Sequence, residues 1–79
     1  MNRIQTLPRT TAAIRYRQRE QLTGGVVVLN KGIPTTWLPS MPPAKDWQEG
    51  IEAVDADGNE WSAQGGNEDG AEFWRQLNG

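Results

Sequence analysis

The stretch DADGNEWSAQGGNEDG, which begins at Asp55, is the part of the chain whose side chains most resemble a metal site. It opens with Asp-x-Asp-x-Asn, as calcium-binding loops do, so that Asp57 and Asn59 fill the third and fifth positions of such a loop. The sixth position requires glycine and holds Glu60, and the twelfth requires a bidentate glutamate and holds Gly66. The sequence therefore predicts a turn between two strands, with no metal site.

The residue types that are missing exclude most catalytic chemistry. The chain has no histidine and no cysteine, so it contains no Ser-His-Asp or Cys-His arrangement, no histidine zinc site and no disulfide. Paired carboxylates can hydrolyse glycosides, but they need a cleft that removes one acid from water. With 79 residues, of which 35% are hydrophobic, the chain has little core from which to build one. We therefore predict a protein that is not an enzyme and carries no cofactor.

The charges are distributed unevenly along the chain. Residues 1–31 hold six basic side chains and one acidic side chain, for a net charge of +5, whereas residues 32–79 have a net charge of −7. The two halves can attract each other within one fold, or the basic half can bind nucleic acid. The candidate residues for the second interpretation are Arg15, Arg17 and Arg19. If they lie on a strand, Tyr16 is on the opposite face, and this weakens the hypothesis because nucleic-acid surfaces mix basic and aromatic side chains on one face.

Two elements are expected in the first part of the chain. Residues 26–29, three valines and a leucine, are the clearest strand. The preceding residues 11–22 fit a strand that joins it through a Gly24-Gly25 hairpin turn, which is the interpretation we prefer. A helix over residues 11–22 is the alternative, because alanine, arginine, glutamine and glutamate favour helices.

The second part of the chain predicts a loop, a hairpin and a helix. Residues 32–50 contain four of the five prolines, and this predicts a loop with extended pieces and a short helix that ends at Glu49. Residues 51–63 predict a hairpin around Asp57-Gly58. The tail from Asn67 predicts a closing helix that presents Phe73, Trp74 and Leu77 on one face.

These elements together predict a small α+β fold. We expect an antiparallel sheet of three or four strands, made of two hairpins, with a C-terminal helix packed on one face. Residues 1–10 are expected to form a flexible N-terminal arm, and residues 11–79 a single domain. No apolar run approaches the roughly 20 residues that span a bilayer, and no secretory signal is evident, so a cytoplasmic protein with no membrane partner is expected.

The four tryptophans suggest both a core and a binding surface. Trp61 and Trp74 are expected in the core, because a short chain has few other large side chains to bury. Trp37 falls in the proline-rich loop, where exposed aromatic and methionine side chains are typical of protein-binding surfaces. The predicted partner-binding residues are Trp37, Leu38, Met41, Asp46, Trp47 and Glu49.

The function expected from these features is that of a non-enzymatic protein-binding module. A small inhibitor or accessory protein that acts on a larger partner, of the kind that phages and mobile elements carry, fits the size and acidity of the chain. A nucleic-acid-associated regulator that uses the basic N-terminal half is one alternative. A structural subunit of an assembly such as a virion is another.

Overall fold

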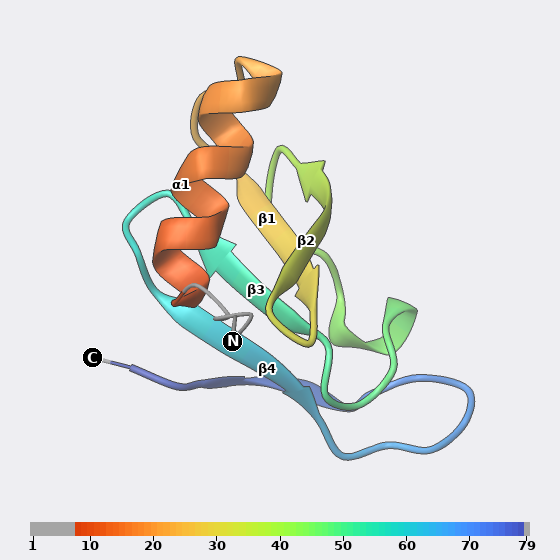
Figure 1. Cartoon of the computed structure of the whole chain (residues 1–79). Coiled ribbons are helices and arrows are strands. Elements are labelled where there is room, and N and C mark those ends of the chain that lie inside the picture. The colour runs from red at the N-terminus through yellow and green to blue at the C-terminus, as the bar shows by residue number, and fades with distance from the viewer. Residues whose placement is uncertain (1–7, 79) are drawn as a thin grey trace, which may run out of the picture.

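One helix and five strands form the fold, and the computed structural model describes residues 8–78 (Figure 1). The strands form one sheet in the order β2-β1-β3-β4-β5, and every neighbouring pair is antiparallel. The elements are α1 (Arg9–Glu20), β1 (Val26–Asn30), β2 (Ile33–Leu38), the 3₁₀ turn η1 (Ala44–Asp46), β3 (Glu52–Asp55), β4 (Glu60–Gln64) and β5 (Phe73–Gln76).

The predicted fold class is wrong in the number of strands and in the position of the helix. The helix precedes the sheet instead of closing it, and the sheet has five strands instead of three or four. The preferred strand over residues 11–22 is wrong as well: this segment has helical propensity, and as a helix it packs Ala12 and Ala13 on the sheet. Gln21 takes a left-handed conformation with φ of 58°, and the Leu22 N–H donates to the carbonyl of Arg17 at 2.9 Å, which ends the helix.

The predicted C-terminal helix is instead the strand β5, which pairs antiparallel with β4. Phe73 and Arg75 are exposed, whereas Trp74 is half-buried and donates its indole N–H to the carbonyl of Pro42 at 2.7 Å. The segment before the strand contains Gly70, whose φ of 144° is incompatible with a helix.

The sheet buries a different cluster on each of its two sides. The cluster under α1, called here the helix-side cluster, consists of Ala12, Ala13, Val27, Leu29 and Val54, with Tyr16 and Trp37 packed against it. The two alanines carry small side chains, so the helix can lie close to the sheet. The second cluster consists of Ala44, Ala63 and Ala71, with Ile51 and Trp74 packed against it. Because Ala44 belongs to η1, the segment between β2 and β3 completes this cluster (Figure 1).

Aliphatic side chains form the centre of the core, and the tryptophans lie around it. The largest fully buried side chains are Leu29, Val27, Val28 and Val54. All four tryptophans are half-buried. Trp61 and Trp74, which were predicted to be core residues, are therefore not at the centre of the core. Trp74 does pack against the second cluster.

The predicted hairpin over residues 51–63 is confirmed, since β3 and β4 pair around a turn that contains Gly58. Within residues 32–50, predicted as a loop with extended pieces, Ile33–Leu38 forms the edge strand β2, and the predicted short helix is reduced to η1. Of the predicted arm, residues 9 and 10 belong to α1, and residues 1–7 lie outside the described residues. Within residues 8–78, no helix is long and apolar enough to cross a membrane.

Candidate binding site

The proline-rich segment does not present Trp37 and Leu38 as a free surface. Trp37 lies in β2 and packs against the helix-side cluster, and its indole N–H donates to the carbonyl of Gly24 at 2.8 Å. Leu38 is half-buried and pairs with Val26 of β1. Both residues therefore contribute to the fold.

The other predicted partner-binding residues lie elsewhere in the molecule. Met41, Asp46 and Glu49 are exposed, and the Glu49 carboxylate accepts a long hydrogen bond of 3.4 Å from the N–H of Gly65. Trp47 is half-buried, and its indole nitrogen is buried without an acceptor among the residues that the structure describes. Asp46 belongs to η1, which packs on the second cluster, whereas Trp37 packs against the helix-side cluster. The six predicted residues therefore do not form one surface.

The three candidate nucleic-acid-binding arginines, Arg15, Arg17 and Arg19, do not share one face of α1. Arg17 is directed toward the sheet. Its guanidinium group donates to the carbonyls of Gly24 at 3.0 Å, Gly25 at 3.1 Å and Val54 at 3.1 Å. Burial lowers the pKa of Arg17, and the nearby carboxylate of Asp55 opposes this shift. Arg17 therefore ties α1 to the turn before β1 and to the end of β3.

Replacing Arg17 by alanine is expected to destabilise the protein by about 2 kcal/mol, because the change leaves three carbonyl groups without their charged donor. Arg15 is exposed on the same helix, so Arg15→Ala serves as the matched control and should change the free energy of unfolding by about 0.5 kcal/mol or less. Urea denaturation measures both. Equal effects of the two variants would contradict the role assigned to Arg17.

The remaining two arginines line a cleft between α1 and β2. The residues at positions 12, 15, 16 and 19 recur at helical spacing and so share one face of α1. This face and the start of β2 enclose an open cleft of about 320 Å³, which we call the helix–strand cleft. Its lining residues are Ala12, Arg15, Tyr16, Arg19, Ile33 and Pro34.

The helix–strand cleft combines an exposed aliphatic surface with positive charge. The Ile33 side chain is 65% exposed, the largest exposed fraction among the large hydrophobic residues that the structure describes. The guanidinium carbon of Arg19 lies 5.4 Å from the centre of the Tyr16 ring, within the range of a cation–π interaction. The site can therefore receive an apolar group and an anion together.

The basic N-terminal half of the chain is partly neutralised by ion pairs at Arg9, but it keeps its positive charge at the helix–strand cleft. Arg9 forms ion pairs with Glu52 at 2.9 Å and Glu60 at 3.1 Å, which join the basic half to the acidic half. Within residues 8–78, Arg15 forms no ion pair, and Arg19 pairs with Glu20, an exposed neighbour in the same helix, at 3.3 Å. The cleft therefore keeps a positive charge.

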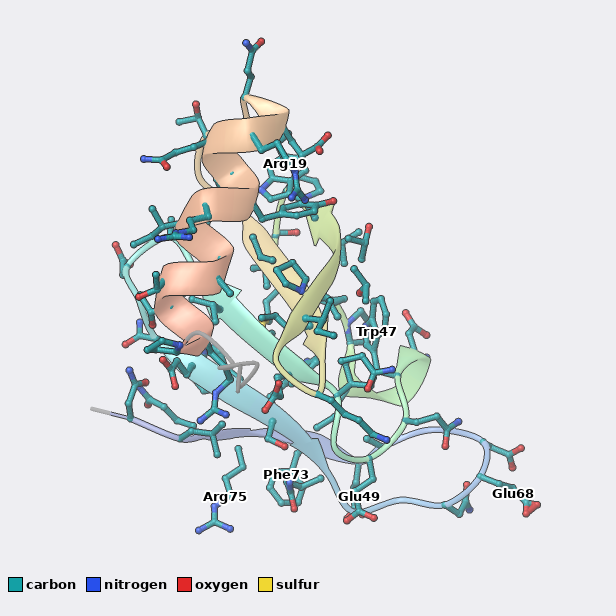
Figure 2. All side chains as sticks on the ribbon, viewed as in Figure 1. Arg19, Trp47, Glu49, Glu68, Phe73 and Arg75 are labelled. Atoms are coloured by element: carbon teal, nitrogen blue, oxygen red, sulfur yellow. The ribbon has the colours of Figure 1, made fainter. Side chains whose placement is uncertain are left out.

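Two exposed acidic side chains, Glu49 and Glu68, lie at the other end of the molecule. Figure 2 shows Arg19 near the end of α1, whereas Glu49 and Glu68 lie at the opposite end, beside the loop between β4 and β5. An approaching anion is thus attracted to one end of the molecule and repelled from the other.

The stretch that resembles a calcium loop uses its first carboxylate within its own turn. Asp55 accepts hydrogen bonds from the N–H groups of Asp57 at 3.0 Å and Asn59 at 2.9 Å, and from the Asn59 side chain at 3.1 Å. We predict that this turn does not bind calcium tightly. Calorimetry with millimolar calcium should show no binding tighter than about 10⁻⁴ M, and micromolar affinity would contradict the prediction.

Two carboxylates have lowered pKa values in the folded protein. The hydroxyl of Thr10 donates to Glu60 at 2.7 Å and lowers the pKa of Glu60; partial burial opposes this, and Arg9 lowers the pKa further. Partial burial raises the pKa of Asp55, but hydrogen bonds from Asn59, Trp61 and Asp57 outweigh burial and leave the pKa lowered.

Acid is therefore expected to destabilise the fold. A carboxylate whose pKa is lower in the folded than in the unfolded chain stabilises the protein above the unfolded values, about 3.9 for aspartate and 4.3 for glutamate. This contribution is lost as the pH falls through those values and then through the lower folded ones. Urea denaturation between roughly pH 7 and pH 3 should show the loss, and Glu60→Gln and Asp55→Asn should each make it smaller. If both variants lost as much unfolding free energy on acidification as the parent, the stabilising role of these two carboxylates would be contradicted.

Sequence reasoning missed Tyr16, Ile33 and Pro34 as site residues, although the helical alternative for residues 11–22 carried the signal for Tyr16. In a helix, Tyr16 shares a face with Arg15 and Arg19, whereas in a strand it does not. No local signal placed Ile33 beside them, because the contact depends on the packing of α1 against β2. Comparison of the chain with protein-family models, with curated proteins and with solved structures gave no match.

Proposed function

We propose that this protein is a non-enzymatic protein-binding module that acts in the cytoplasm, as an inhibitor or accessory protein, on a larger partner. The observation that carries the proposal is the helix–strand cleft, where exposed Ile33 lies beside Arg15, Tyr16 and Arg19. Arginine and tyrosine are the residue types that most often dominate protein interfaces. Because the cleft is built on a helix and a strand, its side chains are held in place before a partner arrives.

The chemistry of the cleft favours an acidic segment that contains a large aliphatic side chain. Such a side chain can cover Ile33 and Pro34, while carboxylates of the segment bind Arg15 and Arg19. The arginines then contribute to the association rate as well as to specificity, because they attract the acidic segment from a distance.

A nucleic-acid-associated regulator is the second candidate function. A helix over residues 11–22 favours this candidate more than the predicted strand would. Tyr16 lies on the same face as Arg15 and Arg19, which is the combination that binds single strands. Three features rank it below protein binding. Arg17 is occupied by backbone carbonyls, Arg19 lies over the Tyr16 ring on which a base would stack, and Ile33 adds an aliphatic surface that a phosphate backbone does not need.

Selection from a displayed library of random peptides against the immobilised protein tests the proposal. The enriched peptides should combine acidic residues with a large aliphatic residue. Their affinity, measured by fluorescence anisotropy, should fall by about tenfold or more in Ile33→Asp and in the double variant Arg15→Ala/Arg19→Ala. The controls Gln18→Ala and Met41→Ala change exposed residues that do not line the cleft, and they should bind like the parent.

A single-stranded DNA oligonucleotide, measured in the same way, separates the two candidates. Binding of this probe near physiological salt that is abolished in Arg15→Ala/Arg19→Ala would replace the proposal with the second candidate. Peptides whose affinity is unchanged in both cleft variants would overturn the assignment of the site.

A further inference from the structure

The two outer strands of the sheet differ in how well they are protected from pairing with another chain. At the β2 edge, Pro34 removes a backbone donor, and the register with β1 shifts between Val28 and Leu29. Proline and irregular pairing are devices that keep an edge strand from adding a further strand. β5, with the sequence FWRQ, contains no proline, and its register with β4 is unbroken from Phe73 to Gln76, whereas the N–H of Glu72 just before it donates to the carbonyl of Gln64 at 2.9 Å.

The backbone of β5 has hydrogen-bonding groups directed away from the sheet. The N–H of Leu77 donates to the carbonyl of Glu60 at 2.7 Å, so residues 73, 75 and 77 direct their backbone groups toward β4. Backbone groups alternate along an antiparallel strand, so those of Trp74 and Gln76 are directed outward. Within the described chain, β4 is the only strand paired with β5.

The side chains of β5 form a pattern suited to a second strand. Phe73 is 50% exposed and Leu77 is 40% exposed, and exposed Arg75 lies between them in the sequence. Figure 2 shows Phe73 and Arg75 projecting to the same side of β5. Such an arrangement presents an aromatic ring and a cation at positions separated by one residue.

We propose that β5 pairs antiparallel with β5 of a second copy of this chain, about a twofold axis at Trp74, and so forms a continuous ten-stranded sheet. In this register the outward backbone groups of the two Trp74 residues face each other. Phe73 of each copy lies opposite Arg75 of the other, and this is a non-hydrogen-bonded pair, in which side chains are closest. Both cations then lie beside aromatic rings.

The pattern of β5 is self-complementary, and this identifies the occupant as a second copy. A twofold interface repeats each contact, so a Phe73–Arg75 pair is formed twice without any further sequence requirement. The neighbouring register, with the axis at Arg75, is disfavoured because it places the two Arg75 side chains directly opposite each other.

Sedimentation velocity over a range of concentrations tests the proposal with a matched pair of variants. Gln76→Pro removes an outward N–H and leaves the bonds to β4 in place, whereas Gln76→Ala keeps that N–H. Both lose the contact between the Gln76 side chain and Asn59, so their difference isolates the edge. The parent and Gln76→Ala should dimerise with similar affinity. Gln76→Pro should dimerise about tenfold or more weakly while retaining the parent's circular dichroism spectrum.

The register is tested separately by disulfide cross-linking, since the chain has no cysteine of its own. Non-hydrogen-bonded pairs bring Cα atoms to about 4.5 Å, within reach of a disulfide. An oxidised mixture of Phe73→Cys and Arg75→Cys should give a cross-linked dimer, and either variant alone should give much less. A parent that stays monomeric at millimolar concentration, or a dimer equally strong in Gln76→Pro, would overturn the proposal.

Discussion

Replacement of Trp37 by alanine is expected to lower the free energy of unfolding by about 3–5 kcal/mol, which is a large part of the stability of a domain this small. The indole packs against the helix-side cluster beneath α1, and its N–H donates to the carbonyl of Gly24 at 2.8 Å. Its removal leaves a cavity between β2 and α1 and a carbonyl without its indole donor. Urea denaturation, followed by circular dichroism, measures the loss.

Two further variants separate packing from hydrogen bonding at this position. Trp37→Phe keeps an aromatic ring but loses the bond to Gly24, and it should cost about 1 kcal/mol more than ring volume alone predicts. Met41→Ala changes an exposed side chain of the same proline-rich segment and should have almost no effect. If the Trp37→Ala variant melted within a few degrees of the parent, Trp37 would be a surface residue and not a part of the core.

The second large effect is expected at Gly25, and Gly24 provides the control beside it. The two glycines have φ of +69° and +68°, so an added side chain strains the backbone to the same extent at either position. At Gly24 a new Cβ atom meets nothing within 4 Å. At Gly25 it overlaps the carbonyl oxygen of Leu38 and lies 2.6 Å from two ring atoms of Trp37.

Gly24→Ala is therefore expected to cost about 1–2 kcal/mol from backbone strain alone. Gly25→Ala adds the displacement of β2 and of the Trp37 ring, and it should cost at least about 2 kcal/mol more than the control. The difference between the two melting temperatures measures the steric contribution directly. Equal losses would show that the turn before β1 and the Trp37 ring do not approach each other as described.

Local signals sufficed for the parts of the fold whose partners are close in sequence. The run of valines predicted β1, and Asp57-Gly58 predicted the β3–β4 hairpin, because a turn and its flanking strands lie within a few residues of one another. In the segments that were predicted wrongly, the local sequence favoured helix and strand almost equally. Helix or strand over residues 11–22 was decided by the packing of Ala12 and Ala13 on the sheet, and strand β5 by the open side of β4.

The sequence by itself determined which side chains are available: no histidine, no cysteine, and two oppositely charged halves. These facts need no fold, because they follow from composition. Only the tertiary structure decided what each side chain does. Three arginines at alternate positions would share one face of a strand, but α1 has 3.6 residues per turn, so Arg15 and Arg19 face the helix–strand cleft while Arg17 is turned toward the sheet. Ile33 joins the two cleft arginines because α1 packs across β2, a contact between segments that no local pattern connects.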